Sequence, residues 1–252
     1  MEELHPRYNA GHFIEGALAH YLYYKNHDML SPILKYVDLL VNTFGNQEGQ
    51  IPGYPGHPEI ELALLRLYKV TGESKHLQLA KFFIDERGNP CGGKEKRHYY
   101  DVEAKARGEG EYDLPMYFPA ARSYWYESPS SGINVSNDRS RYQQAHKPIV
   151  NQETIEGHSV RAMYLLTAVA DLVRIYKPES EVGATFLPAI HRLWSNMVGK
   201  KTYVTGGIGA MKKWEGFGID YFLPQSTDEG GCYAETCAAI GVMMLAERLL
   251  QV

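Results

Sequence analysis

The residues best suited to chemistry lie near the end of the 252-residue chain, in the motif YAETC. Its Glu235 and Cys237 offer a carboxylate and a thiol two positions apart at the start of a predicted helix. Positions i and i+2 do not face each other within a regular helix, so both side chains can reach one metal ion only at the first turn. Thiolate and carboxylate suit zinc, whose structural sites take four ligands. On spacing alone, a buried cysteine beside a carboxylate that interacts with the helix dipole is the better interpretation.

The other two cysteines do not complete a zinc site in any obvious way. Cys91 and Cys232 form no CxxC motif, and three cysteines argue against a disulfide framework. A metal ligand, a reactive thiol and plain burial all remain open for them. Cys232 precedes Glu235 by three residues and is close enough in sequence to approach the same metal.

Histidine recurs after glycine near the predicted starts of helices, in GHFIE (His12), GHPEIE (His57) and EGHSVR (His158). An imidazole at the positive end of a helix resists protonation, which leaves it a neutral donor or acceptor for a ligand. A fourth, His146 in YQQAHKP, comes just before the His158 helix. The alternative for each is a histidine that caps or packs a helix end.

The glycine-rich stretch YVTGGIGA is not predicted to bind phosphate. It lacks the GxGxxG spacing and the GK[ST] ending of nucleotide-binding loops, and it does not lead directly into a helix. We interpret Gly206, Gly207 and Gly209 as a turn that lets the backbone pass close to a ligand or to another segment.

Paired helices account for most of the chain and must position these residues. Hydrophobic periodicity predicts helices over 10–26, 31–45, 57–72, 73–88, 152–176, 183–198 and 232–250, mostly joined by short turns. A loop-rich polar insertion is predicted at about 89–147, and a short β-hairpin within 201–224. We therefore predict an all-α domain over 1–252, with helical hairpins that form a partial α/α toroid and long loops that hold the site at one end.

Composition narrows the class of ligand. The net charge is −4 with no basic block, so no nucleic-acid partner is expected. Neither a leader sequence nor a run of about 18 apolar residues is present, so we expect no membrane span and a cytoplasmic location. The 19 tyrosines combine flat rings with polar tips and favour a carbohydrate ligand.

Seven motifs, in order, resemble those of glycoside hydrolase family 127, the β-L-arabinofuranosidases: GHFIEGALAHY, GHPEIELALLRLYKVTGE, QAHKP, GHSVRAMYL, YVTGGIG, EGFGIDYFLP and YAETCAAI. The resemblance spans most of the chain outside the polar insertion. It implies an (α/α)6 barrel followed by β-sandwich domains, and a retaining exo-glycosidase with a glutamate acid/base and a zinc-bound cysteine nucleophile. The implied partner is a small-molecule or oligosaccharide substrate.

The resemblance also implies roles for individual residues. Glu215 in WEGFGIDY matches the acid/base, and Glu235 and Cys237 match two zinc ligands. The sugar-binding candidates are three histidines, His57, His146 and His158.

The chain departs from the family at both ends. The adjacent cysteine pair that supplies the nucleophile, and the β-sandwich domains, do not occur within the 252 residues. We therefore expect a truncated barrel that self-associates through its exposed edges. Two alternatives remain: an inactive sugar-binding or scaffold fragment, and another α/α-toroid sugar enzyme such as an epimerase or an unsaturated uronyl hydrolase.

Overall fold

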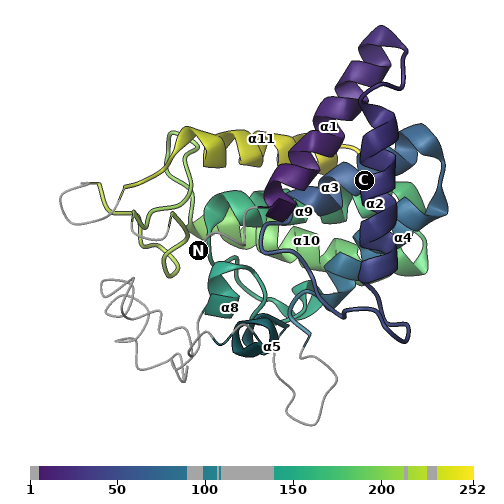
Figure 1. Cartoon of the computed structure of the whole chain (residues 1–252). Helices are drawn as coiled ribbons and strands as arrows, with labels where there is room; N and C mark the ends of the chain where they lie inside the picture. Colours follow the sequence, from purple (N-terminus) through teal and green to yellow (C-terminus); the bar gives the residue numbers. More distant parts are fainter. Residues whose placement is uncertain (1–5, 90–98, 107, 109–138, 213–214, 226–231) are drawn as a thin grey trace.

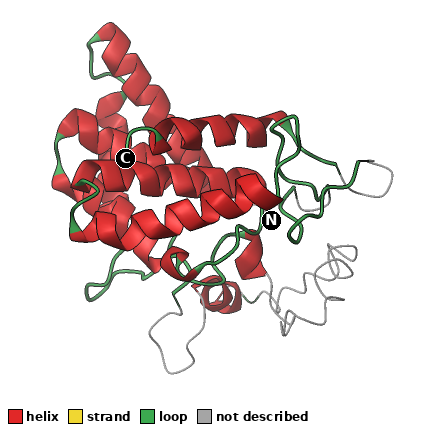
Figure 2. Cartoon of the chain, turned by 180° about the vertical axis from the view of Figure 1, so that it is seen from behind, coloured by secondary structure: helices red, strands yellow, loops and turns green. Residues whose placement is uncertain are grey.

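A computed structural model describes the chain except for residues 1–5, 90–98, 107, 109–138, 213–214 and 226–231 (Figure 1). Most of the polar insertion predicted at 89–147, and Cys91 with it, therefore lies outside the described residues. The described part is mainly helical (Figure 2). Its helices are α1 (Pro6–Tyr24), α2 (Leu30–Thr43), α3 (Glu59–Thr71), α4 (Ser74–Glu86), α5 (Tyr99–Ala106), α8 (Arg139–Tyr142), the 3₁₀ turn η1 (Ile149–Asn151), α9 (Ser159–Tyr176), α10 (Glu181–Lys200) and α11 (Thr236–Leu249).

The ends of α3 follow from its sequence. Pro58 is the N-cap, and Glu59 and Glu61 lie in the first turn, where the helix dipole favours carboxylates. Gly72 ends the helix in the left-handed conformation (φ 71°), and its N–H donates to the carbonyl of Tyr68. The end at Gly72 confirms the predicted stop, while the helix begins at Glu59 and not at the predicted 57.

Several predicted helix starts differ from the structure: α9 begins at Ser159 and not at 152, and α11 begins at Thr236 and not at 232. Helix α2 begins at Leu30, because the N–H of Ser31 already donates to the carbonyl of His27, so Ser31 does not cap it. Helix α1 begins at Pro6, which puts His12 inside the helix and not at its start. The dipole at a helix N-terminus therefore does not explain the chemistry of His12.

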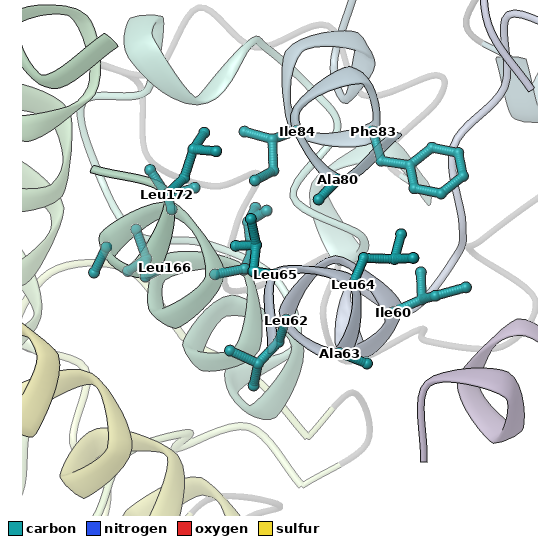
Figure 3. Close-up of a cluster of buried hydrophobic side chains, with 14 of the residues drawn as sticks. Ile60, Leu62, Ala63, Leu64, Leu65, Ala80, Phe83, Ile84, Leu166 and Leu172 are labelled. Carbon is teal, nitrogen blue, oxygen red and sulfur yellow. The ribbon is translucent and has the colours of Figure 1, made fainter. Parts of the chain in front are cut away.

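The helices form one row with a second set packed against it. Helices α1, α3, α9 and α11 are neighbours in that order, and α2, α4 and α10 pack against α1, α3 and α9 (Figures 1 and 2). We call the first four the helix row. Leu62, Leu65 and Leu166 are buried where α3 meets α9, and Ile84 reaches this cluster from α4 (Figure 3). Among the described residues, no helix is long and apolar enough to cross a membrane.

Where the sequence predicted a hairpin, the described residues contain isolated antiparallel bridges. Thr202 pairs with Ile208, and Met211 pairs with Gly216. The turn between Thr202 and Ile208 closes through the N–H of Tyr203, which donates to the carbonyl of Gly207 over 2.9 Å.

Candidate active site

The candidate residues gather at one end of the helix row. His57 comes two residues before α3, His158 is the N-cap of α9, and Glu235 is the N-cap of α11. The positive N-terminal ends of α3 and α9 meet, since Arg161 donates to the carbonyl of Gly56 over 3.2 Å, and α11 lies beside α9 with Gly241 against Met163. The charge of Arg161, in the first turn of α9, acts on both His57 and His158.

The carboxyl group of Glu215 lies between two potential donors at this end. Its Oε2 is 3.0 Å from Nε2 of His158. Its Oε1 accepts a hydrogen bond of 3.3 Å from the hydroxyl of Tyr233. The Glu215 side chain remains 45% exposed, so both oxygens are held while the group is still accessible to a ligand.

The contacts of His158 determine its tautomer. Its Nδ1 accepts from the backbone N–H of Arg161 over 3.5 Å, so the proton of a neutral ring lies on Nε2, facing Glu215. Burial, with the nearby charge of Arg161, lowers the His158 pKa to about 3. His158 is therefore neutral at physiological pH and donates to the Glu215 carboxylate.

The backbone holds Glu215 in an uncommon conformation. Its φ of 52° is in the left-handed region, which is rare for a residue with a side chain. Its carbonyl accepts from both the N–H (3.0 Å) and the hydroxyl (2.8 Å) of Ser159, and the N–H of Phe217 donates to the carbonyl of Gly157. Such conformations persist where surrounding bonds fix them, and they cluster at functional sites.

The glycines of YVTGGIGA let this segment pack closely against the start of α9 and against the segment that contains Tyr233. Gly209 has φ 80°, and a Cβ there would lie 2.6 Å from Oγ of Ser159. Its carbonyl accepts from the N–H of Ala234, so the segment containing Tyr233 runs beside the start of α9. The predicted turn with a close backbone approach is confirmed, and the approaching partner is another segment of the chain.

His57 is also neutral, chiefly because it is desolvated. Desolvation, followed by the charge of Arg161, lowers its pKa to about 2. Its Nδ1 accepts from the N–H of Glu59, and its ring packs edge-on against Tyr164 at 5.2 Å. The lowered pKa agrees in direction with the neutral imidazole predicted at this helix start, and its largest cause is desolvation.

His146 lies beside a different acidic group. Burial by itself raises the Glu156 pKa, but the charges of His146 and Arg141 outweigh it, so the pKa is lowered. The loop that carries His146 is tied to the α9 start by Gln144, whose side-chain nitrogen donates to the carbonyls of Glu156 and His158. His146 thus belongs to the Glu156 side of this loop.

Three residues that lie near His158 or Glu215 were not singled out as candidates from the sequence: Tyr142, Arg161 and Tyr233. The Arg161 guanidinium lies 4.9 Å from the centre of the Tyr142 ring, which itself packs at 5.4 Å from the His158 ring. Burial raises the Tyr142 pKa, and the charges of Glu215 and Glu235 raise it further. All three residues lie within the sequence motifs described above, and this position was the only sequence feature that could have indicated them as site residues.

Glu235 and Cys237 meet at the start of α11, as their spacing required. Glu235 is extended (ψ 155°), and its side chain makes no capping bond. Burial raises the Cys237 pKa, and a hydrogen bond to Glu235 and its charge raise it further. The donor types fit zinc, but among the described residues no group of three or more His, Cys, Asp or Glu side chains could hold a metal. These two residues therefore account for only two ligands.

Comparison with known proteins gives a consistent result. A model of the β-L-arabinofuranosidase GH127 catalytic domain matches residues 2–252. The non-reducing end β-L-arabinofuranosidase of Bifidobacterium longum subsp. longum is 34% identical over 252 residues, which cover 99% of this chain and 33% of that protein.

Two solved structures are similar across nearly the whole chain. The crystal structure of a GH127 β-L-arabinofuranosidase from Geobacillus stearothermophilus T6 has a TM-score of 0.79 and 38% identity, with 98% of this chain and 33% of that one covered. A second GH127 β-arabinofuranosidase has a TM-score of 0.72 and 35% identity over 98% and 30%. The chain thus spans about a third of the length of these relatives.

Proposed function

The chain belongs to the GH127 catalytic-domain family, and from this premise we propose that it is the part of a β-L-arabinofuranosidase that supplies the acid/base. The proposed substrate is a terminal L-arabinofuranose or a similar sugar on a small molecule or an oligosaccharide. We also propose that the helix row, with the helices packed against it, is part of an (α/α)6 barrel.

The observation that supports this proposal most directly is the pair of contacts on Glu215. Retaining hydrolysis needs one carboxyl group that first protonates the departing glycosidic oxygen and then deprotonates water. Donation from His158 Nε2 and from the Tyr233 hydroxyl suits the ionised, base form. A hydroxyl also accepts, so in the acid form Tyr233 can accept a hydrogen bond from a protonated Oε1. Neutral His158, with its proton on Nε2, would continue to donate to Oε2.

Glu235 and Cys237 would hold zinc in the complete enzyme. Zinc would keep the thiol of Cys237 as a thiolate, since the surroundings in this chain favour the protonated thiol. The resemblance assigns the nucleophile to a zinc-bound cysteine of an adjacent pair, and no such pair occurs in this sequence. The chain would therefore contribute two ligands to a site that other residues complete.

The three histidines named from the sequence are proposed to bind the sugar. His57 is neutral, so it can exchange hydrogen bonds with hydroxyl groups without a charge. His158 is proposed on its motif and on its place beside Glu215, to which its Nε2 proton is already directed. His146 is proposed on its motif, since the structure puts it beside Glu156. The rings of Tyr142 and Tyr233 lie in the same neighbourhood and offer surfaces and hydroxyls of the kind that carbohydrate sites use.

An arylarabinofuranoside assay with added zinc tests the proposal. It compares three proteins: the 252-residue chain, a version extended to include the downstream cysteine pair, and the extended version with Glu215→Gln. We expect turnover only from the extended protein, and a loss of about 10²- to 10⁴-fold in kcat for Glu215→Gln, the usual contribution of an acid/base group.

The matched control is Glu153→Gln in the extended protein. Glu153 is an exposed carboxylate on the loop before α9, so its removal should leave kcat unchanged. Turnover that survives Glu215→Gln would refute the assigned role. Binding of L-arabinose without turnover in the extended protein would favour the sugar-binding alternative.

A further inference from the structure

The contact between α1 and α3 contains a buried carboxyl group that the proposed function does not use. Glu59 is the first residue of α3, and its side chain is 2% exposed. Its Oε1 lies 3.3 Å from Nδ1 of His12 on α1. Its Oε2 is buried, with no hydrogen-bond partner among the described residues.

The main chain of α1 is shaped to receive this carboxyl group. A Cβ on Gly11 would lie 1.5 Å from Oε2 of Glu59, so the carboxyl group can keep this position only with glycine at position 11. The carboxyl group therefore fills a space against the α1 backbone. This packing against Gly11 involves Oε2 and is separate from the contact between Oε1 and His12.

Nearby charges do not favour an ionised Glu59. Arg66 pairs with Glu15 of α1, and its charge lowers the Glu59 pKa only in part. Burial first, and then the charges of Glu15 and Glu61, raise the Glu59 pKa to about 9. An ionised carboxylate with one oxygen buried and unbonded would carry a large desolvation cost, whereas a protonated one would not.

We propose that Glu59 is a positioning residue that keeps the proton of the Glu59–His12 pair and donates it from Oε1 to Nδ1 of His12. Since Nδ1 then accepts, the imidazole of His12 is neutral and carries its own proton on Nε2. The alternative, an imidazolium paired with a carboxylate, would leave Oε2 as a buried unbonded anion.

A protonated Glu59 also affects the charge near the candidate site. His12 is close enough to His57 for a charge on its ring to lower the His57 pKa, so it belongs to the same neighbourhood, and its side chain is 43% exposed. The pair keeps this part of the site uncharged and gives His12 one fixed tautomer. The inference concerns protonation in the folded chain and does not depend on the proposed function.

Infrared spectroscopy of the 252-residue chain tests where the proton lies. At neutral pD the wild-type spectrum should contain a carbonyl stretch of a buried carboxylic acid, which Glu59→Gln removes and His12→Phe shifts. Glu15→Gln is the matched control, because Glu15 is a neighbouring carboxylate that pairs with Arg66 and should contribute no such band. The band should also disappear as pH rises through about 9.

Nitrogen-15 NMR of the histidine side chains gives a second test, which already applies to the wild type. His12, assigned with His12→Asn, should show one protonated nitrogen, Nε2, at neutral pH in the wild type and in Glu59→Gln. The amide of glutamine can also donate to Nδ1, so the conservative variant should preserve the tautomer. Two protonated nitrogens on His12, or an infrared band that survives Glu59→Gln, would overturn the proposal.

Discussion

At the scale of single residues, the candidate site depends on backbone conformations that few residue types adopt. Gly157 has φ 80°, and its carbonyl accepts from the N–H of Phe217 just after Glu215. A Cβ at this position would lie 2.1 Å from the carbonyl oxygen of Arg141. The position therefore excludes a side chain both by conformation and by space.

Gly157→Ala should lower the free energy of unfolding by at least about 1–3 kcal/mol, the usual cost of an unfavourable backbone conformation. The clash with Arg141 should add to this loss. Chemical denaturation measures the change. The matched control is Gly199→Ala in α10, where no atom lies within 4 Å, and where the helix propensity of alanine should stabilise by up to about 1 kcal/mol. Equal stabilities of the two variants would show that the Gly157 backbone is not constrained as described.

The two buried histidines predict a pH dependence of stability. Their pKa values fall from 6.5 to about 2 for His57 and about 3 for His158. Between pH 6.5 and about 3 the unfolded chain therefore binds protons that the folded chain does not. The free energy of unfolding should fall as pH falls through this range.

The measurement is thermal or chemical unfolding from pH 7 to pH 4. His57→Gln and His158→Gln should each flatten the dependence, because glutamine does not titrate. His191→Gln is the control, since His191 is exposed on α10 and should leave the slope unchanged. A slope that none of the three variants alters would contradict the burial of neutral imidazoles.

At the scale of elements, a buried ion pair fixes the loops around α3. Arg87, at the end of α4, donates to Oε1 of Glu61 over 2.8 Å and to the carbonyls of Pro55 and Gln143. Both charged side chains are at most 1% exposed. One side chain thus joins α4 to the loop before His57 and to the loop that follows α8.

Arg87→Met should lower the free energy of unfolding by about 3–5 kcal/mol, because it leaves the charge of Glu61 buried without its partner. The double variant Arg87→Met with Glu61→Leu should recover part of the loss, since it removes both charges. A double-mutant cycle by chemical denaturation gives the coupling. If the stability losses of the two single variants simply added in the double variant, Arg87 and Glu61 would contribute to stability independently.

The elements also show what the sequence could and could not predict. Most helices and the pairing of consecutive ones follow from local periodicity, so they were predictable. The order of the row was not predicted, because it brings together helices that are far apart in the sequence. His158 and Glu215 were both named as candidates. The two residues are 57 positions apart, and no sequence pattern indicates that their side chains are in contact. The contact depends on the close packing of Gly157 and Gly209 at the start of α9.

At the scale of the whole molecule, large apolar side chains are exposed on the last helix of the row. Ile240 and Met243 lie one turn apart on α11, with exposures of 52% and 70%, and Leu250 just beyond its end is 89% exposed. Exposed apolar surface of this kind favours association. The self-association expected from the sequence remains a prediction, and this surface is where we expect it.

Met243→Glu should shift the sedimentation profile of the chain towards the monomer at concentrations where the wild type associates. Val204→Glu is the matched control, because it adds the same charge at a fully exposed valine in a loop. An equal effect of both variants would attribute the change to net charge and would refute a role for the α11 surface.

The common direction of α3 and α9 has a practical consequence. Their N-terminal ends carry the candidate residues, so their C-terminal ends, at Gly72 and Lys177, lie at the opposite end of the row. The 13 residues of α3 span about 20 Å at 1.5 Å per residue. A fluorophore or a surface anchor attached at these turns would therefore report on the protein, or immobilise it, without blocking the approach to Glu215.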